Sequence, residues 1–498
     1  MNTLTVLKPT LNSVTMSAEK RRDCMFKREL NAKLVLSVIA TGIMSFSGVV
    51  VETAMNVTFP TLMEEFSIGT STVQWMTTSY LLILAIIMPM SSFLNRRFKT
   101  KSIFTVAMIF YISGILCGFA APTFMLLLLG RILEGIGTGL ALPLMFNIIT
   151  EQAPLKNMGV MMGIGMLVTA VAPAVGPSAG GWIAEHLGWR MIFAGLLPFL
   201  IVAFILGISS IQQSHETEVI SFDVFGWLLL TVSFIALIFV IDESSAFGLL
   251  SIPVLLAMVI FVGSLALFVR HENSFKYQEQ SDKSPKIPII NLEVFSEKGF
   301  VLSLFAIVAL QFIILGQSYL LPNFSQLVLG AGATAAGAQM LPGCAIGAVM
   351  APISGQILDK LGAKKPIVTG ILCCLTSMLL LLLFVHQLTV EMITYIFAIF
   401  AIGQALQMGN NFTVALGHLP EDRKADGNAV INTMQQLFGA MGTSVISGVV
   451  AASQLGATDL ATSTLAGAQN ALFVLVCVAC IPLVTMGIVL FVLPKMTK

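Results

Sequence analysis

Residues 172–181 read APAVGPSAGG and place two prolines and three glycines within ten positions. They lie in an uncharged, apolar run, residues 158–183, which is long enough to cross a bilayer, since a spanning helix needs about 20 apolar residues. Proline removes a backbone donor and bends a helix, and glycine lets a neighbouring backbone come close. The stretch therefore predicts a bent membrane helix that packs tightly against its neighbours.

The rest of the chain has the composition of an integral membrane protein. Of its 498 residues, 56% are hydrophobic and only 10% are charged, too few to cover the surface of a soluble protein. Fourteen apolar segments are long enough to span a bilayer: residues 34–59, 73–94, 102–121, 124–149, 158–183, 191–211, 225–241, 249–269, 300–321, 335–358, 367–384, 389–416, 429–452 and 471–493. They are too long for the alternating strands of an outer-membrane barrel, so we expect an all-α integral membrane protein.

The lysines and arginines orient these segments. Seven of the 26 basic residues precede the first segment, and seventeen more fall in alternate loops or the C-terminal tail, on the same side. Arg190 lies on the opposite side, and Arg131 lies within a segment. Because basic loops stay in the cytoplasm, we expect both termini there, in a multi-pass protein of the cell membrane. The first segment is too long for a signal peptide, so no cleavage is expected.

Two short basic turns, offset by 264 residues, indicate an internal repeat. One is residues 91–101, after the second segment, and the other is residues 355–365, after the tenth. Six segments with their loops occupy only 178 residues (34–211), so the larger offset leaves room for two added helices between two six-helix halves. The expected division is an N-terminal tail (1–33), a six-helix bundle (34–212), two inserted helices (213–269), a cytoplasmic loop (270–298), a second six-helix bundle (299–494) and a C-terminal tail (495–498).

The stretch at 172–181 resembles a motif of the major facilitator superfamily, and specifically of its fourteen-span drug:proton antiporters. The resemblance covers the chain from the first segment to the last. The antiporter motif on the family's fifth span is G-x8-G-x3-GP-x2-GG, and it is matched here, with one glycine replaced by alanine, at Gly163, Ala172, Gly176, Pro177, Gly180 and Gly181. In the family this motif goes with export, so the resemblance implies an exporter with a movable seal between two six-helix bundles; a merely kinked packing helix is the alternative.

The basic turns resemble the superfamily's GxLxDRxGxRR loop. The second turn fits at Gly355, Asp359, Lys360, Gly362, Lys364 and Lys365. In the first, Ser91, Asn95 and Phe98 replace the glycine, the aspartate and the second glycine, and Arg96 follows the asparagine. The resemblance implies cytoplasmic gating loops, with a latch between the tenth and eleventh segments. Topology alone would also explain the lysines.

Three charged residues lie deep within the expected segments: Glu52, Arg131 and Glu134. Each costs about 2.5–3.5 kcal/mol on insertion scales, so each needs a partner, water or a function. At about 1.5 Å per residue, Glu52 and Arg131 both lie about 12–14 Å below the outer surface. Arg131 and Glu134 share one helix face through their i,i+3 spacing.

Two interpretations of these charges stay open. They could form an ion pair that locks the first segment to the fourth, or the carboxylates could change protonation as water access alternates, which would couple protons to transport. Two acids around one arginine also leave net negative charge, which suits a cationic substrate. Residues 131–135 resemble the family's RxxQG, with glutamate for glutamine. Residues 52–60 resemble its DxTxxNxxxP, with the acid moved by one position from Val51 to Glu52.

Further polar residues recur at helical spacing inside the segments. We expect them to line a substrate cavity, although hydrogen bonds between helices explain many such residues without a substrate. They are Asn56, Gln74, Thr78, Gln311, Gln317, Tyr319, Gln404, Gln407, Asn411, Asn432 and Gln435. With 34 Phe and 27 Met, the chain favours an adaptable apolar cavity that accepts varied ligands.

The sequence favours a transporter over an enzyme. It contains no GxxxxGK[ST] loop, its five histidines are scattered, and Cys477 and Cys480 lie in an apolar segment, so we expect no cofactor and no metal. The expected function is proton-driven export of amphipathic, cationic compounds, with a small-molecule substrate, protons and the lipid bilayer as partners, no nucleic acid, and a monomeric state. Two alternatives stay open: a dedicated exporter or importer of one metabolite, lipid or peptide-like molecule, and a non-transporting sensor or scaffold.

Overall fold

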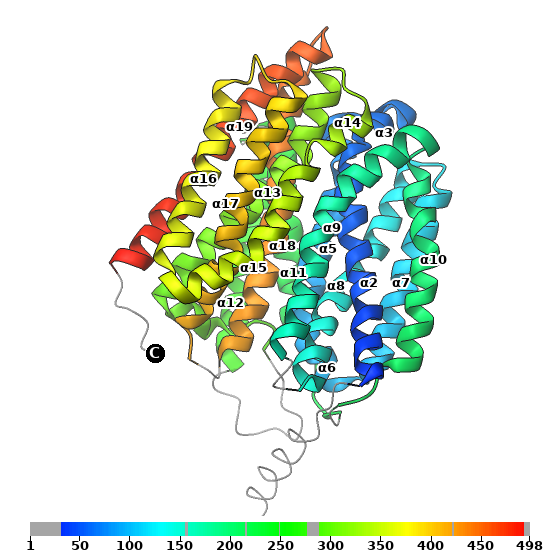
Figure 1. The fold of residues 1–498 in the computed structure, drawn as a ribbon, viewed down its shortest axis with the longest axis vertical. Helices are drawn as coiled ribbons and strands as arrows, with labels where there is room; N and C mark the ends of the chain where they lie inside the picture. Colours follow the sequence, from blue (N-terminus) through cyan, green and yellow to red (C-terminus); the bar gives the residue numbers. More distant parts are fainter. Residues whose placement is uncertain are drawn as a thin grey trace, which may run out of the picture.

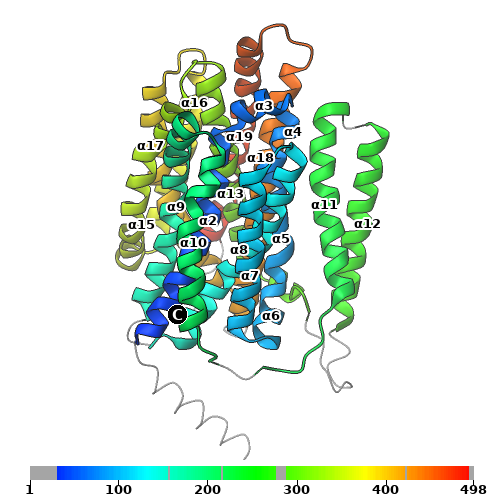
Figure 2. The same ribbon diagram turned by 90° about the vertical axis from the view of Figure 1, so that its right-hand side faces the viewer.

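The computed structural model describes residues 31–154, 158–214, 217–248, 250–275, 288–420 and 423–492. Thirteen helical stretches in these ranges are long and apolar enough to cross a membrane. In addition, α9 (Met158–Leu187) is a 30-residue helix at the fifth expected segment. The expected fold class is confirmed: two helical bundles lie side by side (Figure 1), and two further helices stand beside them (Figure 2).

The N-terminal bundle contains six spans, and its second span is divided into three helices and a 3-10 turn. Polar caps start several spans, as where Asn31 accepts a hydrogen bond from the Leu34 amide. The elements are α2 (Ala32–Val57), α3 (Phe59–Phe66), α4 (Thr70–Val73), α5 (Trp75–Ile87), η1 (Met88–Met90), α6 (Ser91–Arg97), α7 (Thr100–Ala120), α8 (Phe124–Gln152), α9 and α10 (Arg190–Ser210).

The C-terminal bundle repeats this plan after a short 3-10 turn, η3 (Leu292–Ser296). Its helices are α13 (Lys298–Leu327), α14 (Ala333–Ala338), α15 (Leu341–Leu361), α16 (Lys364–Leu383), α17 (Val390–Gly417), α18 (Lys424–Gln454) and α19 (Leu460–Phe491). The short helices α3 and α14 lie at one end of the molecule and α6 at the other (Figure 1). These are called the α14 end and the α6 end below.

The inserted helices, α11 (Val224–Phe247) and α12 (Ile252–Phe275), are central in the sequence but peripheral in space (Figure 2). They pair with each other, and α11 packs against both α5 and α18. The contact with α18 is formed by buried apolar side chains, whereas near the α6 end Trp227 Nε1 donates a hydrogen bond to the Ile86 carbonyl, 3.0 Å away, in α5. The pair therefore stands beside the seam between the two bundles.

The two basic turns are shorter than the sequence predicts. Residues 91–97 form helix α6, with Arg96 and Arg97 in its last turn, where positive charge interacts favourably with the helix dipole. Likewise α15 continues through Asp359 and Lys360 and ends only at Gly362, whose φ of 74° is one that glycine adopts readily. Most of each motif is thus helical, and the connections shrink to two residues.

Candidate functional site

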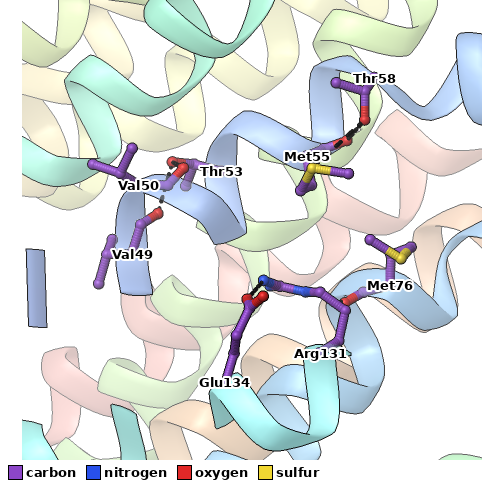
Figure 3. Close-up of polar contacts among 8 residues, drawn as sticks. All are labelled: Val49, Val50, Thr53, Met55, Thr58, Met76, Arg131 and Glu134. Atoms are coloured by element: carbon purple, nitrogen blue, oxygen red, sulfur yellow. Dashed lines mark hydrogen bonds and ion pairs between the residues drawn. The ribbon is translucent and has the colours of Figure 1, made fainter. Parts of the chain in front are cut away.

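Arg131 and Glu134 form an ion pair in the interior of the N-terminal bundle. Both side chains are completely buried. The Arg131 Nη1 group donates to a carboxylate oxygen of Glu134, and its Nε donates to the Met76 carbonyl at 3.0 Å (Figure 3). The guanidinium carbon also lies 4.3 Å from the centre of the Tyr80 ring. The cation is therefore held from α5 and α8 at once.

Glu52 lies near this pair but outside it. Its side chain is 7% exposed on α2, and it is close enough to Arg131 for the positive charge to act on it. No ion pair within 4 Å joins the two in the described residues. Arg131 thus binds Glu134 directly, whereas Glu52 lies on the neighbouring helix α2 without an ion pair to it. That two acids share one arginine stays a prediction.

The Gly/Pro stretch of α9 makes two kinds of close contact. Within the N-terminal bundle, Gly176 and Gly180 lie against α2, where an added Cβ would collide with Thr53 and Ala54. Across the two bundles, Gly181 lies against the Ala333 carbonyl at the start of α14. The remaining motif positions lie in the same helix: Ala172 is fully buried, Pro177 is within α9, and the surroundings of Gly163 fall outside the described residues.

The opposite bundle supplies a glycine of its own to this contact. A Cβ on Gly337 of α14 would collide with the carbonyl of Pro177, so the backbones touch from both sides. Next to it, Glu185 accepts a hydrogen bond from the Thr334 amide at 2.6 Å. The two bundles are thus in backbone contact at the α14 end.

Three expected cavity residues lie at the seam between the bundles, and a fourth binds the inserted helix beside it. Asn56 Nδ2 donates to Ser318 Oγ at 3.0 Å, and the Thr78 hydroxyl lies 3.2 Å from that of Ser444. Gln74 Nε2 donates instead to Asp242 of the inserted helix α11, 2.6 Å away. Tyr319, 2% exposed, packs its ring 5.9 Å from that of Phe59.

Two others turn into the C-terminal bundle. Gln317 Nε2 lies 2.9 Å from the Met378 sulfur, and Gln407 Nε2 lies 3.2 Å from the Cys374 sulfur. Both sulfurs belong to α16. The rotation of α13 and α17 about their axes therefore sends these amides away from the seam, which periodicity alone does not specify.

The other five expected cavity residues divide by exposure. Asn411 is fully buried, and neither atom of its amide has a partner among the described residues. Gln435 is 5% exposed and lies 3.8 Å from the Met408 sulfur. Partly exposed side chains complete the set: Gln311, Gln404 and Asn432. Their assignment to a substrate cavity stays a prediction.

The expected gating residues are fixed in different ways at the α6 end. Asn95 donates to Glu151 at 2.8 Å, and Arg96 pairs with Glu218 at 2.6 Å, both within the N-terminal half of the chain. In the C-terminal half, Lys364 lies 4.2 Å from the Phe491 ring centre. Lys360 is exposed, nothing lies within 4 Å of a Cβ on Gly355, and the side chain of Asp359 falls outside those described. The latch between the tenth and eleventh spans stays a prediction.

A further charged residue lies within a span, and the sequence analysis missed it. The seventh segment was expected to end at residue 241, whereas α11 continues to Phe247 and ends before Gly248, whose φ is 82°. Asp242 therefore lies inside the helix. Its two carboxylate oxygens accept hydrogen bonds from Gln74 Nε2 at 2.6 Å and Trp75 Nε1 at 3.0 Å. The signal available in the sequence was the absence of a helix breaker before Gly248.

Comparisons with known proteins give a consistent result. A family model described as the Major Facilitator Superfamily matches residues 41–221 and 219–443. The lincomycin resistance protein LmrB of Listeria monocytogenes is 33% identical over 458 residues, which cover 90% of this chain and 95% of that protein. The multidrug resistance protein Stp of Mycobacterium tuberculosis is 25% identical over 425 residues, which cover 85% and 77%.

The fold comparison points the same way. A crystal structure of an auto-inhibited POT family peptide transporter matches with a TM-score of 0.66 at 13% identity, over 94% of this chain and 98% of that one. At this identity the match describes the fold alone, and the family model and the LmrB match carry the assignment. The chain belongs to the major facilitator superfamily and is a multi-span membrane transporter of small molecules, not an enzyme.

Proposed function

We propose that this protein is a proton-driven antiporter that exports amphipathic, cationic compounds from the cell by alternating access. The names of its relatives, which include resistance to lincomycin and to multiple drugs, support drug export. The antiporter motif on α9 supports export over uptake. A dedicated exporter of a single compound is the alternative within the same fold.

The buried Arg131–Glu134 pair with Glu52 beside it carries the proposal of proton coupling. Removing three charges from water is unfavourable, and a purely structural lock would need only one acid for one arginine. Among the residues that the structure describes, Glu52 has no ion-pair partner within 4 Å, so it could bind a proton without breaking a salt bridge. With both acids ionised the site carries one net negative charge, which attracts either a proton or an organic cation. Proton and substrate would then compete for the same charge.

The orientation of the chain gives the contacts between the bundles a role. The lysine and arginine distribution supports a cytoplasmic α6 end and cytoplasmic termini, which would turn the α14 end outward. The contacts of Gly181 and Gly337, with the hydrogen bond from Thr334 to Glu185, then close the outer side. We infer that the Gly/Pro stretch is the outer seal and that it parts when the transporter opens outward.

The test uses inside-out membrane vesicles with ethidium and lincomycin as probes. Glu52→Gln keeps the shape of the side chain but cannot titrate, so gradient-driven uptake of both probes should stop while ethidium binding persists. Glu64→Gln, an exposed acid of α3, is the matched control and should transport normally. Full gradient-driven transport by Glu52→Gln would contradict the coupling role. Transport of only one probe, without competition by the other, would favour the single-compound exporter.

A further inference from the structure

The ion pair is surrounded by buried polar atoms that have no hydrogen-bond partner in the described part of the chain. They come from four different helices of the N-terminal bundle. They are Ser45 Oγ of α2, Tyr80 Oη of α5, Tyr111 Oη of α7, and Thr138 Oγ1, Arg131 Nη2 and Glu134 Oε1 of α8. All six residues are essentially inaccessible to solvent. Buried polar groups are normally satisfied by protein or by ordered water, so a cluster of this kind is a place for internal water.

A glycine holds the hydroxyls of this cluster close together. A Cβ on Gly48 of α2 would lie 2.6 Å from Thr138 Oγ1 and 2.8 Å from Tyr80 Oη, so both oxygens face the same small space beside that glycine. The two hydroxyls are close enough to interact, yet no direct hydrogen bond of ordinary geometry joins them in the described part of the chain. One bridging water between them would satisfy both.

The cluster also has a direction. In α8 Thr138 follows Glu134 by one turn, and in α2 Ser45 precedes Glu52 by two turns, both toward the α6 end. At about 1.5 Å per residue, the hydroxyls extend about 10 Å from the acids toward that end. The next hydroxyl in α2, Thr41, donates instead to the Ser37 carbonyl at 2.9 Å, so its bonding is internal to the helix. The unsatisfied atoms thus run from the acids toward one side of the membrane.

We propose that Tyr80, Thr138 and Ser45 hold a chain of water through which the buried acids release protons toward the α6 end. This rests on the proposed function, in which the acids carry protons and the α6 end is cytoplasmic. A protonated Glu134 or Glu52 gives its O–H proton to the first water, and each water or hydroxyl accepts one proton and donates another, since hydroxyls do both. One proton leaves, a carboxylate remains, and no electrons move. Tyr80, Thr138 and Ser45 are positioning residues that do not contact the substrate.

The test removes hydroxyls without removing volume. Tyr80→Phe keeps the aromatic face under Arg131, and Thr138→Val keeps the branched shape. In reconstituted vesicles with entrapped pyranine, each variant should slow ethidium-coupled proton release about tenfold or more, and the solvent deuterium isotope effect should rise. Ethidium binding and ethidium counterflow, which needs no net proton movement, should stay normal. Thr138→Ser restores the hydroxyl and should restore the rate.

The matched control is Thr41→Val, the same substitution at a buried threonine whose hydroxyl is already satisfied; it should release protons at the normal rate. Gly48→Ala is a third variant, because its methyl would occupy the space between the two hydroxyls, and it should also slow release. Normal proton release by Tyr80→Phe and Thr138→Val, in a protein that Glu52→Gln or Glu134→Gln inactivates, would overturn the water chain and leave the proposed function standing. Normal coupling in the two glutamine variants would overturn both.

Discussion

The two bundles share one fold but differ in the chemistry of their interiors. The N-terminal bundle buries the charges of Arg131, Glu134 and Glu52. In the C-terminal bundle, none of the described residues of α13–α19 is both charged and buried. Its buried polar contacts join neutral groups, such as the Gln317 amide with the Met378 sulfur and the Asn410 amide with the Ser354 hydroxyl. Related folds therefore do not imply shared tasks. Under the proposed function, the N-terminal bundle would bind and release protons, and the C-terminal bundle would supply a neutral interior.

The largest effect should follow from Arg131→Ala, which leaves Glu134 buried without its cation. Breaking a buried pair by removing one partner costs about 3–5 kcal/mol, so we expect a marked fall in the thermal stability of the purified protein and loss of ethidium efflux. Arg131→Lys should restore stability only in part, because a compact ammonium cannot bind Glu134 and the Met76 carbonyl together. If Arg131→Ala were as stable as the wild type, the Arg131–Glu134 ion pair would not be what stabilises the buried charges of the N-terminal bundle.

The second largest effect is expected from two glycine variants of α9, one at a contact between the bundles and one at a contact within the N-terminal bundle. Gly181→Ala would force a methyl against the Ala333 carbonyl, so it should weaken outer closure and lower efflux while the protein stays folded. Gly176→Ala collides with Thr53 inside the N-terminal bundle, so it should instead lower stability, by about 1–3 kcal/mol as for other overpacked sites. Melting curves and proton leak in vesicles, measured for both variants, check this. Equal stability losses without any leak would mean that the whole stretch only packs α9.

A smaller effect is expected in the C-terminal bundle. Gln317→Leu and Gln407→Leu replace buried amides by apolar groups of similar size, and the sulfur partners lose little, so stability should change by about 1 kcal/mol or less. Proton release measured with pyranine should be unchanged. A loss of proton coupling in either variant would break the division of tasks between the bundles.

The smallest effect is expected where the bundles meet at the α14 end. The hydrogen bond from the Thr334 amide holds the pKa of Glu185 below its usual value of 4.5. Because the pKa of Glu185 is lowered in the closed form, its ionised carboxylate stabilises that form at any pH above the usual pKa. This stabilisation is lost as the pH falls through the lowered pKa and the carboxylate is protonated. The labelling of a single cysteine introduced at the α14 end, which reports opening of this contact, should therefore rise slightly only below pH 4.5. Glu185→Gln should remove that pH dependence. If Glu185→Gln showed the same increase in labelling in acid, a titratable group other than Glu185 would be responsible for that increase.

Much of the fold could be predicted from the sequence because its signals are redundant. Each span is a long apolar run, so an error of a few residues at its boundary does not hide the span. The sorting of basic residues is summed over all the loops, so one misplaced boundary does not change the predicted orientation. The close approach at Gly176 and Gly180 was also foreseeable, since only a neighbouring backbone explains several glycines on one helix. The apolar runs and the glycine pattern can each be recognised within a single segment, and the sorting of basic residues is repeated over many loops.

The remaining features depend on contacts that the sequence does not encode locally. The partner of Gly181 is α14, six residues long and more than 150 positions away. The sequence prediction ended the seventh span before Asp242, because the hydrogen bonds from Gln74 and Trp75 that stabilise this carboxylate inside α11 come from a distant part of the chain. The direction in which Gln407 points depends on how α17 is rotated against α16, and periodicity fixes a face but not its neighbour.

The glycine contacts at the α14 end also set the conformational entropy of closing. Gly181 meets the Ala333 carbonyl and Gly337 meets that of Pro177, so this part of the interface brings backbone against backbone. Burying a long side chain costs up to about 2 kcal/mol in lost rotamers, whereas glycine has none to lose. At these glycines, closing the contacts therefore costs no side-chain conformational entropy, and opening them recovers none. An interface that must form and break in every transport cycle can in this way be tight in shape and yet nearly neutral in side-chain entropy.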